Sequence, residues 1–149
     1  MSEDYKVTRN HYPGVKNVTW SDVIEKLGNE FSGKFAKTIY EESFISPTFV
    51  TNTPYFPGTI GDAYDEITEG KSMFMHTYTS LGSDAATFGR HNDAEDVLIV
   101  QSIGKVLYSF DDGNSYILRP GDSVFIKKEV YHDPVALGPR FTLSLSNPF

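Results

Sequence analysis

Residues 97–126 read VLIVQSIGKVLYSFDDGNSYILRPGDSVFI, a run of short apolar segments separated by turn residues. The turn Asp111-Asp112-Gly113-Asn114 predicts a hairpin, because glycine and asparagine tolerate positive φ. Pro120-Gly121 predicts a type II turn, with a fixed φ followed by a positive one. The strands expected before, between and after these turns are rich in β-branched and aromatic residues. They are Val97–Val100, Val106–Phe110, Ser115–Leu118 and Val124–Ile126.

The flanking sequence continues this pattern on both sides. Residues 72–81 alternate, so that Met73, Met75, Thr77 and Thr79 face one way and Phe74, His76 and Tyr78 the other. Val130–Val135 and Phe141–Leu145 predict two further strands after residue 126. About seven short antiparallel strands at close spacing predict an all-β sandwich or barrel.

The N-terminal half is less regular. One helix is expected from about Trp20, capped by Thr19 or Ser21 and ended by Gly28, because its apolar residues recur at three- and four-residue spacing. Phe35–Phe44 is compatible with a strand or a second helix, and we favour a strand. We therefore expect one domain, with residues 1–70 as an extension packed on a β-barrel core of residues 71–149.

Ser46–Gly70 is predicted to be an irregular loop, because prolines and glycines interrupt it. A loop of this length in a compact domain suits a lid over a binding pocket. On that interpretation Tyr55 and Phe56 lie near a ligand. The alternative is a loop packed over the outer face of the barrel.

Composition limits the function. The chain has 149 residues and a net charge of −7, which argues against a nucleic-acid partner. It has no apolar run long enough to span a membrane and no signal-peptide pattern, so a cytoplasmic location is expected. Disulfide and thiolate chemistry are excluded because there is no cysteine. Nine tyrosines and eleven phenylalanines suit either a β-rich core or an aromatic pocket for a small molecule.

The C-terminal 80 residues resemble the cupin superfamily, whose barrel is a double-stranded β-helix or jelly roll. The spacing of the second cupin motif fits from Gly121 to His132, although Lys127, Glu129 and Ala136 stand where Pro, Gly and Asn are usual. The first motif fits as His91-Asn92-Asp93, with Gly104 as its later glycine. The family's glutamate position falls on Val97. The resemblance implies a cupin-type jelly roll with a short N-terminal helix.

On this resemblance, His91, Asp93 and His132 are candidate metal ligands, and Glu95 is a fourth ligand or a nearby carboxylate. Two imidazoles and a carboxylate suit one divalent ion, such as Fe, Mn, Ni or Zn. Residues 91, 93 and 95 share strand parity, so they can point inward together. A barrel without metal, with a solvated acidic turn, is the alternative.

The resemblance implies a small-molecule-binding cupin that is a metal-dependent enzyme, either an oxygenase, an isomerase or a lyase, acting on an enolisable or carboxylated metabolite. Glu95 would then move protons during catalysis. Candidate substrate-binding residues are those that can line the barrel or bind an anion: His76, Tyr78, Arg90 and Arg140, besides Tyr55 and Phe56.

Three expectations remain open. A metal-free cupin could bind a ligand or catalyse cyclisation by shape alone. The larger 2-oxoglutarate oxygenases share a His-x-Asp…His triad followed by an arginine near a serine or threonine, which Arg140-Phe141-Thr142 imitates, but this chain is short for them. A homodimer is expected, because small cupin barrels often bury one outer face against a copy and residues 35–44 could add an edge strand; a monomer is the alternative.

Overall fold

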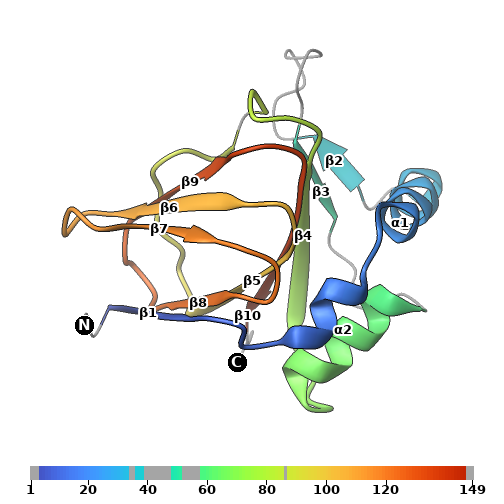
Figure 1. Cartoon of the computed structure of the whole chain (residues 1–149), viewed down its shortest axis with the longest axis horizontal. Coiled ribbons are helices and arrows are strands. Elements are labelled where there is room, and N and C mark those ends of the chain that lie inside the picture. The colour runs from blue at the N-terminus through green and yellow to red at the C-terminus, as the bar shows by residue number, and fades with distance from the viewer. Residues whose placement is uncertain (1–3, 34–35, 39–47, 52–57, 86, 147–149) are drawn as a thin grey trace.

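The fold is built from two antiparallel sheets that face each other (Figure 1). The computed structural model describes residues 4–33, 36–38, 48–51, 58–85 and 87–146. Seven strands form one sheet in the order β1-β8-β5-β10-β4-β3-β2, and three form the other in the order β7-β6-β9. The strands are β1 (Tyr5–Thr8), β2 (Ala36–Thr38), β3 (Thr48–Thr51), β4 (Phe74–Ser80), β5 (Val97–Ile103), β6 (Val106–Phe110), β7 (Ser115–Leu118), β8 (Ser123–Ile126), β9 (His132–Ala136) and β10 (Arg140–Ser146).

The helices cover the outer face of the larger sheet. They are a 3-10 helix, η1 (Pro13–Asn17), and two α-helices, α1 (Trp20–Gly33) and α2 (Thr59–Thr68). Figure 1 shows α1 and α2 together beside β4, away from β6 and β7. No helix in the described part of the chain is long and apolar enough to cross a membrane.

Each face of the larger sheet has its own apolar core. The outer core joins the helices to the sheet, with buried residues such as Val23, Ile60, Met75 and Leu143. The inner core fills the space between the two sheets, with Ile99, Val106, Leu118, Val124 and Ile126 among its residues. The alternation expected for residues 74–80 is confirmed, because Met75, Thr77 and Thr79 are buried while Phe74 and His76 are exposed.

Two predictions for the N-terminal half were wrong. Residues 48–51 and 59–68 are a strand and a helix within the segment predicted as an irregular loop. In α2, the buried residues recur at helical spacing; they are Ile60, Ala63, Tyr64 and Ile67. This helix was not predicted because it is only ten residues long, contains a glycine and follows two prolines, which are signals of a loop. Helix α1 continues to Gly33 instead of ending at Gly28. The predicted cap was right for Thr19, whose hydroxyl accepts a hydrogen bond from Asp22 N (3.3 Å).

The strand predicted over Phe35–Phe44 is confirmed for residues 36–38, which pair with β3 at the edge of the larger sheet. Residues 35 and 39–44 lie outside the described part of the chain.

At the opposite edge, β1 pairs with β8, so the start of the chain joins the barrel. The Tyr5 ring is stacked on Phe110, with 3.7 Å between ring centroids. Its hydroxyl donates a hydrogen bond to Asp112 Oδ2 (2.6 Å) in the β6–β7 turn. This strand therefore connects the edge of the larger sheet to the smaller sheet.

Gly104, at the β5–β6 turn, is the glycine matched to the first cupin motif, and its backbone needs that residue. Its φ is 75°, and a Cβ there would lie 2.1 Å from the Pro139 carbonyl oxygen. Gly113, in the β6–β7 turn, has a φ of 88° with open space around it. The two glycines therefore share a left-handed backbone but differ in how closely another chain segment approaches.

We expect Gly104→Ala to lower the free energy of unfolding by about 3 kcal/mol or more, because backbone atoms must move to admit the methyl group. The matched control Gly113→Ala should cost only about 1 kcal/mol, from positive φ alone. Denaturant unfolding of both variants measures the difference. Equal losses would show that the close approach to Pro139 has no energetic consequence.

Candidate metal centre and its pocket

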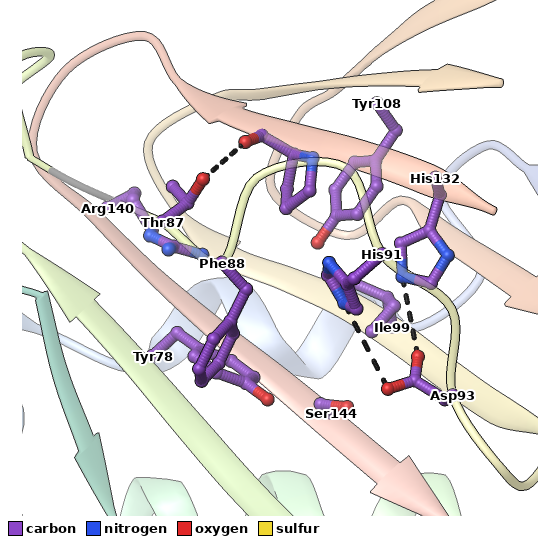
Figure 2. Close-up of a pocket in the computed structure, with 11 residues that line it drawn as sticks. Tyr78, Thr87, Phe88, His91, Asp93, Ile99, Tyr108, His132, Arg140 and Ser144 are labelled. Atoms are coloured by element: carbon purple, nitrogen blue, oxygen red, sulfur yellow. Dashed lines mark hydrogen bonds and ion pairs between the residues drawn. The ribbon is translucent and has the colours of Figure 1, made fainter. Parts of the chain in front are cut away.

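Three side chains meet between the two sheets in a group that could hold a metal ion. His91, Asp93 and His132 each offer one ligand atom, and these atoms lie within 4.8 Å of one another. His132 Nε2 is 3.4 Å from Asp93 Oδ2, and His91 Nε2 is 4.0 Å from Asp93 Oδ1 (Figure 2). Two imidazole nitrogens and one carboxylate are a common ligand set for divalent iron and related metals.

Backbone hydrogen bonds hold the three residues in place. His91 and His132 form an isolated β-bridge, with N–O distances of 2.9 and 2.8 Å. The backbone N–H of Glu129 donates to the Asp93 carbonyl (2.7 Å). Glu129 has a φ of 65°, and it stands where the second cupin motif has a glycine. The turn before β9 thus has the backbone conformation that the motif glycine would favour, and it positions Asp93 beside the histidines.

The orientation of both imidazoles fits metal binding. His91 Nδ1 is 2.7 Å from the Gly89 carbonyl oxygen, and His132 Nδ1 is 3.0 Å from the Val130 carbonyl oxygen. Because a carbonyl only accepts, each Nδ1 carries a proton, which leaves each Nε2, on the side of Asp93, as the atom that can bind a metal. Burial is the main cause that lowers the pKa of His132, which favours the neutral ring. Nε2 atoms that face a carboxylate in this way suit a shared cation.

The metal-ligand group forms one side of a hollow that opens to solvent. The remaining lining residues come from both sheets and from the segment before His91; they are Tyr78, Thr87, Phe88, Ile99, Tyr108, Pro134, Arg140 and Ser144. Asp93 is the one carboxylate among the described lining residues.

Arg140 brings a buried positive charge to this hollow. Its side chain is 3% exposed, and it lies over the Tyr78 ring, 5.6 Å from the ring centroid. Nε donates to Ser80 Oγ (2.8 Å) and Nη1 to Thr142 Oγ1 (3.0 Å). No carboxylate in the described part of the chain pairs with it. A buried guanidinium whose described hydrogen-bond partners are all neutral is a strong candidate for binding an anion.

Tyr108 is a candidate that the sequence analysis missed. It is 4% exposed and lines the hollow from β6, and Figure 2 shows its hydroxyl on the side of His91. Within the described residues, this hydroxyl has no hydrogen-bond partner. Burial is the main cause that raises its pKa, so it remains a hydrogen-bond donor at neutral pH. The strand was predicted, but inward parity alone does not separate a pocket tyrosine from a core tyrosine.

Some predicted site residues lie elsewhere. Glu95 is exposed and is not in the group around Asp93, because residues 94 and 95 form a bend and the strand parity used to place Glu95 inward does not hold. Arg90 is exposed and forms two hydrogen bonds to Asp111, outside the described lining of the hollow. His76 is exposed on the face of β4 that carries Tyr78. Tyr55 and Phe56 lie outside the described residues.

Comparisons with known proteins identify the fold. The structure of YcfD, a ribosomal oxygenase from Escherichia coli, matches 97% of this chain with a TM-score of 0.70 and 15% sequence identity. The chain has a cupin-type fold. A second YcfD structure, in complex with cobalt and 2-oxoglutarate, matches this cupin barrel over 97% of the chain with a TM-score of 0.71 and 14% identity. In both comparisons the chain spans about half of the YcfD length, namely 48%.

The more distant structure of FeII HppE matches 74% of the chain and 55% of its own length, with a TM-score of 0.53 and 10% identity. No protein-family model matches the sequence, and a search of curated proteins finds no match either. The comparisons therefore confirm the cupin fold predicted from the two motifs.

Proposed function

We propose that this protein is a metal-dependent oxygenase that binds 2-oxoglutarate, or a closely related 2-oxo dicarboxylate, between the metal centre and Arg140. The observation that carries the proposal is the position of Arg140. Its buried guanidinium faces the same hollow as the three ligand atoms, and no described carboxylate neutralises it. A ligand with one end that chelates a metal and a carboxylate at the other end matches these two groups.

His91, Asp93 and His132 would hold the metal, since their donor atoms converge and both histidines use Nδ1 for a backbone carbonyl and turn Nε2 toward Asp93. When bound, ferrous iron would supply the activation of dioxygen: one oxygen atom enters 2-oxoglutarate as it loses carbon dioxide to become succinate, and the other oxidises a second substrate. The protein orients the co-substrate: Arg140 binds its distal carboxylate, and the Tyr108 hydroxyl donates a further hydrogen bond. YcfD, which has been solved with cobalt and 2-oxoglutarate, supports this choice.

The lining of the hollow favours an oxygenase over an isomerase or lyase. Those reactions need a base that removes a proton from carbon, and a carboxylate is a common choice. The one described carboxylate in the lining is Asp93, which belongs to the metal-ligand group, while Glu95 lies outside it. An oxygenase needs no such base.

The test uses protein loaded anaerobically with Fe(II). Calorimetric titration should show 2-oxoglutarate binding that requires the metal, and admission of dioxygen should then produce succinate slowly without a second substrate. Protein treated with a chelator is the control and should produce none. If the loaded protein binds iron but neither binds 2-oxoglutarate nor forms succinate, the oxygenase proposal is wrong and other cupin chemistry remains.

A further inference from the structure

A chain of buried hydrogen bonds runs from Arg140 to the turn between β5 and β6. Arg140 Nη1 donates to Thr142 Oγ1 (3.0 Å), and that hydroxyl donates to Gln101 Oε1 (2.8 Å). Gln101 Nε2 donates to the carbonyls of Ile103 (2.8 Å) and Gly104 (3.2 Å). Gln101 and Thr142 are both 0% exposed, so water does not compete for these bonds.

The donor and the acceptor of every hydrogen bond between Arg140 and the β5–β6 turn can be assigned. The carbonyls of Ile103 and Gly104 can only accept, so they fix the amide nitrogen of Gln101 toward themselves and its oxygen toward Thr142. The Thr142 hydroxyl therefore donates its single proton to Gln101 and offers its lone pairs to Arg140. Thr142 has no proton left for a ligand, and its contribution to the pocket acts through the guanidinium.

The other end of the guanidinium is held in a similar way. Arg140 Nε donates to Ser80 Oγ (2.8 Å), and Ser80 Oγ is 3.0 Å from Thr48 Oγ1. Ser80 and Thr48 are both fully buried. Neutral groups on two sides thus fix the plane of the guanidinium, and no carboxylate among the described residues compensates its positive charge.

We infer that Gln101 is a positioning residue, which acts through Thr142 to aim Arg140 at a ligand carboxylate in the hollow. The inference rests on the proposed function. A glutamine can orient the arginine without forming an ion pair, whereas a carboxylate at this position would compete with the ligand. The close approach of Gly104 to Pro139, the residue before Arg140, ties the same turn to the backbone of β10.

The experiment measures 2-oxoglutarate binding by calorimetry on Mn(II)-loaded protein. We expect Thr142→Val and Gln101→Met each to weaken binding about tenfold or more, and Thr142→Ser, which keeps the hydroxyl, to stay within about twofold of the parent. Mn(II) affinity should not change in any of them. If Gln101→Met does not fold, as judged by its melting transition, Thr142→Val decides the question.

A double-mutant cycle separates positioning from a general structural effect. Arg140→Lys keeps a charge but lacks the planar donor fork, so Thr142→Val should cause little further loss in that background. An equal loss in both backgrounds, or no loss in the parent, would overturn the inference.

A second readout serves if the parent protein does not bind 2-oxoglutarate. In that case the proposed function fails, and solvent exchange of the Arg140 Nη–H protons, one of which bonds Thr142, tests the positioning by itself when it is followed by NMR. Faster exchange in both Gln101→Met and Thr142→Val would support the positioning role. Unchanged exchange would overturn it.

Discussion

Replacing His132 with alanine should lower the affinity for a divalent metal more than about 100-fold, because it removes one of three ligand atoms. His132 is 3% exposed, burial lowers its pKa, and Val130 O holds its ring in place, so little else at the site needs to rearrange when metal binds. Elemental analysis of protein purified without a chelator or a histidine tag should find close to one metal per parent chain. The variant should contain almost none.

The matched control is His11→Ala. His11 is exposed and bonds Ser123 Oγ at 2.7 Å, outside the metal-ligand group, so its loss should leave metal content unchanged. Circular dichroism should show that both variants keep their strands. A parent protein that holds less than about a tenth of an equivalent after exposure to Fe, Mn, Ni and Zn in turn would contradict the metal centre itself.

Arg140→Gln should weaken 2-oxoglutarate binding by roughly 100-fold or more, equivalent to about 3 kcal/mol. The glutamine keeps hydrogen-bonding groups but loses the charge that would bind a desolvated carboxylate. Metal content should not change, since Arg140 is not one of the three ligands. Elemental analysis measures the metal content, and calorimetry with the metal-loaded variant measures the affinity for 2-oxoglutarate.

Arg90→Gln is the control for charge. Its guanidinium is exposed and is bonded to Asp111, so the affinity for 2-oxoglutarate should stay within about twofold of the parent. Tyr108→Phe provides a smaller comparison, with an expected loss of about tenfold and no loss of stability, because the hydroxyl has no described partner. Similar effects of the two arginine changes would mean that long-range charge, not contact with Arg140, governs binding.

The strands of the barrel could be predicted because their determinants are local. The turns at residues 111–114 and 120–121 contain glycines with φ of 88° and 95°. Strand β6, before the first turn, and strand β7, between the two turns, have the bounds that the pattern predicted. His91, Asp93 and His132 could be found because two motif spacings align them. In each case a few neighbouring residues determine the conformation.

The errors have the opposite cause, since they depend on contacts that the sequence does not display. Helix α2 is fixed by packing on the outer face of the larger sheet, which overrides its glycine and the prolines before it. Glu95 was placed inward by strand parity, but the backbone bends after Asp93. Tyr108 became a pocket residue only because β6 and β10 face each other across the barrel, a relation between distant segments.

The pairing of β1 with β8 has a consequence for solubility. Without residues 5–8, β8 would present a free edge of backbone donors and acceptors, with the apolar Val124 and Ile126 on one face. Such an edge is a template for pairing with another chain. The first strand thus covers the edge of β8, and a cleavage or fusion that detaches Tyr5 from Phe110 would leave that edge free to pair with another chain.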